Sequence, residues 1–275
     1  MTRWIVITGC SSGIGRAAAV ALAARGYEVI ATARREADLE ALRAAGLHPV
    51  HLDLADEHSV AAACAAIAHL TGGVLDAVVN NAAFALPGAV EDLSRAAMRT
   101  QFEANVFGTI DLTNRLLPLL ERSDKGRIVM ISSILGLVAM RWRGAYNASK
   151  FALEGFVQSM RLELRDRNIK VITINPGPIE SRFRLNAQQQ ADRHVDMQNS
   201  RHAERYAGLR KEREQEDGKI GFSQPPQAVV ARIVTAIESK HPALRYLVTG
   251  PAHWLTWLKR LLPERWLDAL LARIS

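Results

Sequence analysis

The segment Thr8-Gly9-Cys10-Ser11-Ser12-Gly13-Ile14-Gly15 joins two stretches with different periodicities. The short β-branched run before it, Trp4–Thr8, predicts a strand, and Ile14–Arg25 after it predicts a helix. Glycines at such a junction allow a tight turn and a close approach of the backbone to a pyrophosphate, whose charge the helix N-terminus attracts. A plain glycine-rich turn is the alternative, but a strand before and a helix after favour a dinucleotide-binding loop.

The same alternation of strand and helix continues along the chain. Further strands are expected at Glu28–Thr32, His48–Leu52, Ala77–Val79, Arg127–Ile131, Lys170–Ile174 and Tyr246–Val248. Further helices are expected at Glu36–Ala45, His58–Leu70, Arg95–Leu120, Ala145–Asp166 and Pro226–Ser239. The strands are nearly continuous apolar runs, as buried parallel strands are. This order predicts an α/β fold: a single-domain, Rossmann-type, doubly wound parallel sheet of about seven strands with helices on both faces.

One charged segment interrupts this order before the last strand. Residues 178–222 are polar and only loosely helical, with the helical part expected from Asn186 to Glu216. Long connections of this kind often form lids or binding segments. We therefore assign residues 1–252 to a dinucleotide-binding and catalytic domain that includes this substrate-lid insertion, and residues 253–275 to an amphipathic helical tail.

The tail carries three of the five tryptophans, with basic residues between its apolar ones. Its apolar residues are Trp254, Leu255, Trp257, Leu258, Leu261, Leu262, Trp266, Leu267, Leu270, Leu271 and Ile274. Pro263 is expected to divide it into two short helices, because proline is tolerated in the first turn of a helix but not in its interior. The tail either docks onto the body or a partner subunit, or lies flat on a membrane surface as basic, Trp-bearing amphipathic helices do.

Composition excludes several classes of protein. Of 275 residues, 48% are apolar and 23% are charged, which is typical of a globular protein. The net charge of +7 comes from scattered Arg residues, often near Glu or Asp, so no nucleic-acid partner is expected. Cys10 and Cys64 lack the spacing of a metal site or a disulfide framework, and no signal peptide or membrane-spanning run is visible. We expect a cytoplasmic protein without a metal.

Tyr146-Asn147-Ala148-Ser149-Lys150 is the main candidate for catalysis. A Tyr and a Lys four residues apart on a helix lie side by side, and a nearby cation lowers the pKa of a phenol from about 10. Alone, such a pair is more often a solvated neighbour pair. Ser132-Ser133, at the end of a predicted strand, and Asn80-Asn81-Ala82, after another, favour function, because α/β sheets bind ligands at the carboxyl ends of their strands.

Taken together, these motifs resemble the short-chain dehydrogenase/reductase family over nearly the whole length, and within it the hydroxysteroid and retinol dehydrogenase-like members. The resemblance assigns cofactor contacts to Gly9, Ser11, Ser12, Gly13, Ile14, Gly15, Asp53, Asn81, Ala82, Tyr146, Lys150, Pro176, Gly177 and Ile179. It assigns a catalytic tetrad to Asn105, Ser133, Tyr146 and Lys150. Two positions depart from the family pattern. Ala83 replaces a usual Gly, and Ser181, preceded by Glu180, is the nearest hydroxyl to a usual cofactor-binding Thr.

The resemblance also implies a role for each member of the tetrad. Tyr146 donates a proton to the alkoxide that forms when the cofactor delivers hydride to a carbonyl carbon, or removes it in reverse. Ser133 hydrogen-bonds the same oxygen. Lys150 lowers the pKa of Tyr146 and contacts the nicotinamide ribose, and Asn105 holds a water that links Lys150 to solvent.

The end of the second strand, Ala33-Arg34, indicates which cofactor is used. An acidic residue there would bind a ribose 2′-hydroxyl and repel a 2′-phosphate. This chain has Ala33 instead, followed by Arg34, whose guanidinium suits a phosphate. We therefore predict NADP(H) in preference to NAD(H).

The predicted function is NADP(H)-dependent interconversion of a lipophilic alcohol with a ketone or aldehyde. Expected substrate contacts are Ser133, Leu135, Met140, Trp142 and Tyr146. Two alternatives are a 3-oxoacyl-type reductase of fatty-acyl or polyketide chemistry and a catalytically idle cofactor-binding regulator. By resemblance, a homodimer or homotetramer is expected through the helices within Asp92–Leu120 and Ala145–Asp166.

Overall fold

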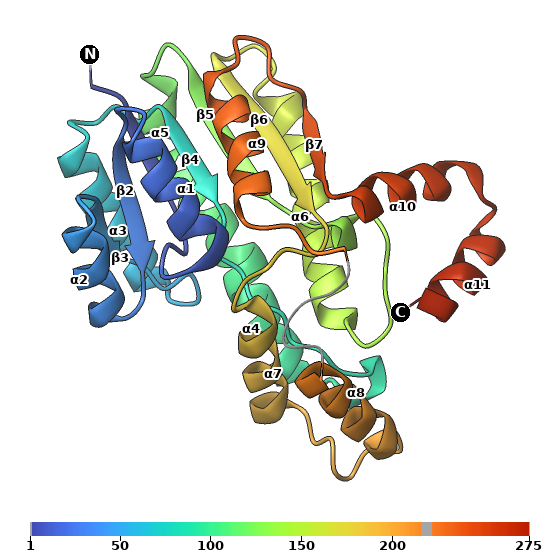
Figure 1. The fold of residues 1–275 in the computed structure, drawn as a ribbon. Coiled ribbons are helices and arrows are strands. Elements are labelled where there is room, and N and C mark those ends of the chain that lie inside the picture. Colours follow the sequence, from blue (N-terminus) through green and yellow to red (C-terminus); the bar gives the residue numbers. More distant parts are fainter. Residues whose placement is uncertain (1, 216–221, 275) are drawn as a thin grey trace.

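The computed structural model describes residues 2–215 and 222–274, and its strands form one parallel sheet (Figure 1). The strands are β1 Trp4–Ile7, β2 Glu28–Ala33, β3 His48–His51, β4 Ala77–Asn80, β5 Gly126–Ile131, β6 Ile169–Pro176 and β7 Arg245–Val248. All seven pair in parallel in the order β3-β2-β1-β4-β5-β6-β7, which confirms the predicted sheet. The order reverses between β1 and β4, where ligands bind in sheets of this kind.

Successive strand residues point to opposite faces of the sheet and build two separate cores. Ile5 and Ile7 of β1 pack in one core, whereas Val6 between them packs in the other. The first core is covered by α1 Gly13–Ala23, α2 Glu36–Ala44 and α9 Gln227–Glu238. The second is covered by α3 Glu57–Leu70, α5 Gly108–Glu121 and α6 Gly144–Glu163. Because both faces are buried, the strands have the continuous apolar sequences from which they were predicted.

A π-helical turn interrupts the helix expected over Arg95–Leu120. The structure has α4 Arg95–Phe102, a π turn at Glu103–Phe107, and then α5. Within the turn, Asn105 Oδ1 accepts a hydrogen bond from Phe84 N (3.1 Å) and its Nδ2 donates to Phe84 O (2.9 Å). This pairing holds Asn105 toward the segment after β4. Such turns occur mostly as single interruptions of α-helices, often at functional sites.

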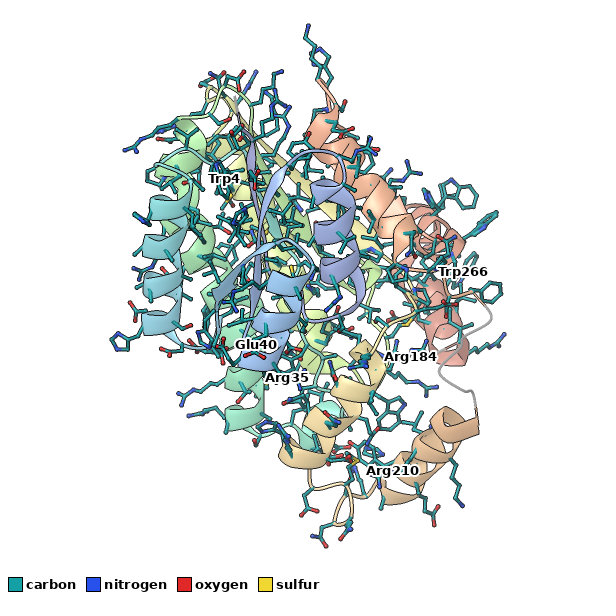
Figure 2. The ribbon with its side chains drawn as sticks, turned by 60° about the vertical axis from the view of Figure 1, so that its left-hand side comes forward. Trp4, Arg35, Glu40, Arg184, Arg210 and Trp266 are labelled. Carbon is teal, nitrogen blue, oxygen red and sulfur yellow. The ribbon has the colours of Figure 1, made fainter. Side chains whose placement is uncertain are left out.

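The charged insertion contains two helices where the sequence predicted one loose helical stretch. Helix α7 spans Phe183–His194 and α8 spans Ala203–Gln215, while Glu216 at the predicted end lies outside the described residues. Figure 2 labels Arg184 on α7 and Arg210 on α8. Tyr206 fastens the insertion to the segment after β4, because its hydroxyl donates to Asp92 Oδ2 (2.6 Å) and accepts from Ala89 N (2.7 Å).

The C-terminal tail docks onto the body as two helices divided at Pro263, as predicted. Helix α10 spans Gly250–Leu261, beginning before the expected start of the tail at residue 253, and α11 spans Glu264–Ile274 (Figure 1). Its buried residues Leu255, Leu267 and Leu271 join an apolar cluster that also holds Leu135 and Val138. Across residues 2–215 and 222–274, no helix combines the length and apolarity needed to cross a membrane.

Substitutions of a glycine at the start of α5 and of another in α6 test how tightly these helices are packed. A Cβ on Gly108 would lie 1.7 Å from Leu54 O, whereas a Cβ on Gly155 of α6 would meet nothing within 4 Å. Gly108→Ala is therefore expected to lower the free energy of unfolding by about 1–3 kcal/mol, because backbone must move to make room. Gly155→Ala is expected to raise it by about 0.5–1 kcal/mol. Chemical denaturation of both variants measures the difference, and equal effects would contradict the packing described.

Candidate active site

The glycine-rich loop between β1 and α1 packs directly against the end of β4. Gly9 has a φ of +72°, and a Cβ on it would lie 2.9 Å from Ala82 Cα. A Cβ on Gly15 would lie 2.3 Å from Gly9 O and 2.6 Å from Asn81 Nδ2. Asn81 Nδ2 in turn donates to Thr8 O (2.8 Å) and Gly9 O (3.2 Å). A side chain at either glycine would fill the loop, so the structure explains why both positions lack one.

The N-terminus of α1 meets the other predicted cofactor contacts across this loop. Ser12 precedes the helix and its side chain makes no capping hydrogen bond, while Ser11 is exposed and Ile14 is half-buried. From the far side, Ser181 approaches: its Cβ lies 3.3 Å from where a Cβ on Gly13 would be. A helix N-terminus that begins with glycines at Gly13 and Gly15 leaves backbone N–H groups accessible and suits a pyrophosphate. The cradle therefore fits the group that the sequence predicts there.

Arg34 and Asp53 face each other at the carboxyl ends of β2 and β3. Arg34 Nη1 lies 3.9 Å from Asp53 Oδ2, with side chains 69% and 36% exposed. An exposed pair at this distance is worth about 0–1 kcal/mol, so Arg34 can turn to another anion at little cost. Asp53 is held more firmly, because its Oδ1 accepts from Ala55 N (3.0 Å). The structure thus brings together the two residues predicted to bind the adenosine half.

Tyr146 and Ser133 meet at the end of β5. Ser133 Oγ accepts from Leu135 N (3.0 Å), and Ser133 is near enough to the phenol to act on the pKa of Tyr146. Ser132 Oγ is instead buried without a hydrogen-bond partner among the described residues, which favours the choice of Ser133. Burial raises the pKa of Tyr146 to about 12, and Ser133 and the charge of Arg143 oppose that rise only in part. The phenol is therefore neutral near pH 7.

Lys150 differs from its predicted arrangement. Its Nζ donates to Ile131 O (2.9 Å) and lies 5.8 Å from the centroid of the Tyr146 ring. The pKa of Tyr146 is therefore set by burial, with Ser133 and Arg143 as the opposing groups, and the expected lowering by Lys150 is not found. Burial lowers the pKa of Lys150 itself to about 8, against the charge of Glu154, which raises it.

Asn105 contacts helix α6, which carries Tyr146 and Lys150, through Ser149 rather than through Lys150. Besides its two bonds to the backbone of Phe84, Asn105 Nδ2 lies 3.3 Å from Ser149 Oγ. Ser149 Oγ donates to Tyr146 O (2.8 Å). Asn105 is thus a buried amide whose oxygen and nitrogen both have hydrogen-bond partners, and its predicted role toward Lys150 stays a prediction.

The turn after β6 meets the end of β7, where sequence reasoning missed Thr249. Gly177 N donates to Val248 O (2.9 Å), and a Cβ on Gly177 would lie 2.2 Å from Thr249 Oγ1. Thr249 has a φ of +85° and a buried Oγ1 that lacks a partner among the described residues. Ile179, two residues beyond Gly177, packs against the core beneath α1 and α9. No sequence pattern marks Thr249, because Gly177, which it lies against, is distant along the chain.

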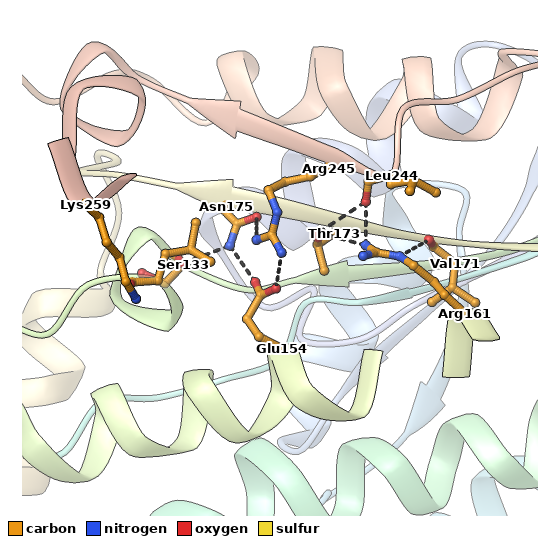
Figure 3. Close-up of polar contacts among 10 residues, drawn as sticks. Ser133, Glu154, Arg161, Val171, Thr173, Asn175, Leu244, Arg245 and Lys259 are labelled. Atoms are coloured by element: carbon orange, nitrogen blue, oxygen red, sulfur yellow. Dashed lines mark hydrogen bonds and ion pairs between the residues drawn. The ribbon is translucent and has the colours of Figure 1, made fainter. Parts of the chain in front are cut away.

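A buried polar network holds the backbone carbonyl of Ser133 in place (Figure 3). Asn175 Nδ2 donates to Ser133 O (2.9 Å) and to Glu154 Oε1 (2.6 Å), and its Oδ1 accepts from Arg245 Nη1 (3.0 Å). Arg245 Nη2 closes the ring by donating to Glu154 Oε2 (2.7 Å). Glu154 lies two turns after Tyr146 on α6, so the network joins the catalytic helix to β6 and β7. In the sequence, the only sign of a role for Glu154 was its position one turn after Lys150.

The predicted substrate residues divide between two apolar clusters. Leu135, Met140 and Tyr146 pack together with the leucines of the tail, whereas Trp142 packs edge-on against Tyr206 at 5.9 Å between ring centroids. Met140 and Trp142 line a groove of about 810 Å³ whose opposite wall is formed by Leu267 and Leu271 of α11. The tail as a wall of this groove was not foreseen, although docking onto the body was one of the two alternatives for it.

The described residues, 2–215 and 222–274, contain no cluster of three or more His, Cys, Asp or Glu side chains that could hold a metal ion. Cys10 beneath the glycine-rich loop donates its thiol to Ile7 O (3.2 Å), and burial raises its pKa to about 12.

Comparisons with known proteins agree with this geometry. The family model described as short chain dehydrogenase matches residues 3–192. The chain is 41% identical to the uncharacterized oxidoreductase YbbO of Escherichia coli K12, over 98% of its own length and 94% of that protein's. It is 38% identical to human retinol dehydrogenase 8, over 88% and 80% of the two lengths. A short-chain dehydrogenase from Streptomyces avermitilis superposes with a TM-score of 0.77 at 28% identity, covering 100% of this chain and 96% of that one.

The protein therefore belongs to the short-chain dehydrogenase family and is an oxidoreductase. Solved structures that share its fold include complexes with NAD and complexes with NADP.

The network behind Ser133 can be tested by a double-mutant cycle. Replacing Arg245 alone with Met leaves the buried carboxylate of Glu154 without its cation, and breaking a buried pair in this way typically costs about 3–5 kcal/mol. The single change Glu154→Leu is expected to cost as much, and the double variant Glu154→Leu/Arg245→Met less than the sum of the two. Urea denaturation of the four proteins measures the coupling energy, and strictly additive costs would show that the pair is not coupled.

Proposed function

We propose that the protein is an NADP(H)-dependent oxidoreductase that interconverts a lipophilic secondary alcohol with a ketone, or a primary alcohol with an aldehyde. The buried Tyr146 with Ser133 near its phenol, together with the glycine-rich cradle, is the observation that carries this proposal. NADPH, when bound, supplies a hydride to the carbonyl carbon. The glycine-rich loop, Ser181 and the turn at Gly177 would hold the cofactor.

Side chains of the protein donate the proton and stabilise the negative charge that develops on the carbonyl oxygen. Tyr146 donates its phenolic proton to the carbonyl oxygen, and a neutral phenol with a raised pKa is the correct protonation state for this step near pH 7. Ser133 stabilises the same oxygen by a hydrogen bond. Lys150, one turn further along α6, lies with its Nζ 5.8 Å from the centroid of the Tyr146 ring and is the group proposed to contact the nicotinamide ribose. Asn175, through Ser133 O, fixes the position of the serine.

Tyr146→Phe tests the proton donor. We expect a fall in turnover of about 10²–10⁴-fold, because the acid is removed while the packing of the ring stays the same. The measurement is NADPH oxidation over a panel of ketones, aldehydes and 3-oxoacyl thioesters. Tyr27→Phe is the matched control, since Tyr27 packs on the α1 side of the sheet, away from the site.

The same panel separates the alternatives. Preference for the thioesters would favour a reductase of fatty-acyl or polyketide chemistry. If the wild-type protein oxidised NADPH with no member of the panel, a catalytically idle cofactor-binding regulator would be favoured. The complete set of Asn105, Ser133, Tyr146 and Lys150 supports activity. Near-normal turnover by Tyr146→Phe would contradict the mechanism.

The preference for NADP(H) rests on the end of β2. Ala33 is buried and uncharged there, and Arg34 is exposed with only a weak ion pair to Asp53. A 2′-phosphate would give Arg34 a stronger, charge-assisted partner.

Arg34→Ala is therefore expected to raise the KM for NADPH about 10- to 100-fold and to leave the KM for NADH nearly unchanged. Arg35→Ala is the matched control, because the neighbouring Arg35 is already engaged by Asp38 (2.7 Å). Steady-state kinetics with both cofactors provides the measurement. An unchanged KM for NADPH in Arg34→Ala would refute the assignment.

The lipophilic character of the substrate is supported by the groove and by similarity. The groove wall contains Val138, Met140, Leu267 and Leu271. Human retinol dehydrogenase 8, at 38% identity, is named for a lipophilic alcohol. These apolar side chains suit such substrates, although the groove is also lined by Arg141, Asn147, Lys259, Glu264 and Asp268.

Self-association is proposed through the helices within Asp92–Leu120 and Ala145–Asp166. Exposed apolar side chains gather there: Met98 on α4, Phe107 in the π turn, and Phe151, Phe156 and Leu162 on α6. Two helices with such faces suit a homodimer, or a homotetramer if a second face is also used. A cytoplasmic location is proposed as well, because the two cysteines, one buried and one half-buried, are both free thiols.

A further inference from the structure

We propose that the outward face of the docked C-terminal tail binds the surface of an anionic lipid bilayer. This goes beyond oxidoreductase activity and does not depend on it. The tail is helices α10 and α11, and its outward face consists of Trp254, Trp257, Leu261 and Trp266 with Arg260, Arg265 and Arg273.

Docking onto the body accounts for the leucines of the tail but not for its tryptophans. Leu255, Leu267 and Leu271 are 7%, 7% and 8% exposed and pack against the loop after β5. Trp254, Trp257 and Trp266 remain 65%, 54% and 66% exposed. Trp266, labelled in Figure 2, lies on the tail away from the central sheet. Three large apolar side chains are thus left in water by a segment that has already buried its other face.

The exposed large apolar residues of α10 form one stripe. Trp254, Trp257 and Leu261 follow at spacings of three and four residues, so they share a face of the helix. The rings of Trp254 and Trp257 contact each other edge-on, with centroids 6.1 Å apart. Indole has a broad apolar surface and a polar N–H, and it is enriched where hydrocarbon meets headgroups.

The charges beside this stripe favour lipid over a second copy of the chain. Arg260, Arg265 and Arg273 are exposed, and within residues 253–274 the four Lys and Arg outnumber the two Asp and Glu. A two-fold interface would bring this basic face against itself, which costs free energy through like-charge repulsion. Anionic headgroups are complementary to it, as they are to other basic, Trp-bearing amphipathic helices.

Contacts with the loop after β5 fix the orientation of the tail. Arg141 Nη2 donates to Ala272 O (2.6 Å) near the end of α11. Lys259 Nζ donates to Leu137 O and lies 5.1 Å from the centroid of the Phe151 ring. The face is therefore presented by two helices held on the body. Leu267 and Leu271 of the same tail line the groove assigned to the substrate, so bilayer binding would bring that groove near the lipid; this last consequence rests on the proposed function.

The test uses the full chain and vesicles of phosphatidylcholine with or without phosphatidylglycerol, measured by flotation. The wild type is expected to float with the phosphatidylglycerol vesicles and to dissociate as salt rises. Trp254→Ser/Trp257→Ser/Trp266→Ser is expected to bind at least about tenfold more weakly, because most of the inserted apolar area is lost. Arg260→Gln/Arg265→Gln/Arg273→Gln is expected to lose the salt-dependent part of the binding.

Val20→Ser/Leu244→Ser is the matched control. It removes exposed apolar side chains, 48% and 64% exposed, from outside both the tail and the proposed self-association face, and should leave flotation unchanged. Quenching of wild-type tryptophan fluorescence by brominated phosphatidylcholine mixed with phosphatidylglycerol gives a readout that needs no variant. Absence of wild-type flotation and quenching, or equal flotation by all variants, would overturn the proposal. So would light scattering that shows the Trp variant changing from oligomer to monomer, because the face would then be a subunit interface.

Turnover of a water-soluble ketone is measured in parallel. Its failure would bear on the proposed function and leave the flotation result intact, so the two proposals fail separately.

Discussion

The structure depends on one kind of contact: polar side chains at the carboxyl ends of the buried parallel strands hydrogen-bond to the backbone of neighbouring segments. Ser132 Oγ and Thr249 Oγ1 are exceptions, without a partner among the described residues. Thr8 Oγ1 accepts from both Asn81 N and Ala82 N at 2.9 Å, which locks the glycine-rich loop to the end of β4. Asn175 satisfies Ser133 O in the same way at the end of β6. An unpaired buried group costs free energy, so each pairing fixes the position of a backbone segment. The cofactor cradle and the catalytic pair owe their geometry to these contacts.

The same burial determines the protonation states of the candidate catalytic groups. Desolvation raises the pKa of Tyr146 to about 12 and lowers that of Lys150 to about 8, so it brings both toward their neutral forms. A neutral Tyr146 is the protonation state that the proposed reduction of a carbonyl requires. Glu154 opposes the neutralisation of Lys150, and Arg245 is its ion-pair partner at 2.7 Å. A residue at the far end of the sheet thereby influences the charge beside the phenol.

Local patterns in the sequence predicted the sheet, and the structure brings many of the predicted site residues together, because strand periodicity and glycine spacing are properties of neighbouring residues. Arg34 with Asp53 and Gly13 with Ser181 are examples. Three features escaped prediction. Arg245 and Glu154 are 91 residues apart, and such a pairing has no local signature. The π turn at Asn105 depends on the backbone of Phe84, which is distant in the sequence. The lower pKa expected for Tyr146 was wrong because the depth of its burial depends on the tertiary structure. The Phe183 ring, for example, packs against Tyr146 with 5.6 Å between the ring centroids.

The central claim is that hydride passes from NADPH to a carbonyl carbon while Tyr146 supplies the proton. Its most direct test follows deuterium from NADPH labelled at C4 of the nicotinamide during reduction of a ketone by the wild-type protein, with the product analysed by mass spectrometry and NMR. The account predicts that, with label on the transferred face, deuterium appears at the carbinol carbon of the alcohol, whereas the new hydroxyl proton comes from solvent. Alcohol formed without deuterium at that carbon from either labelled face would contradict the account.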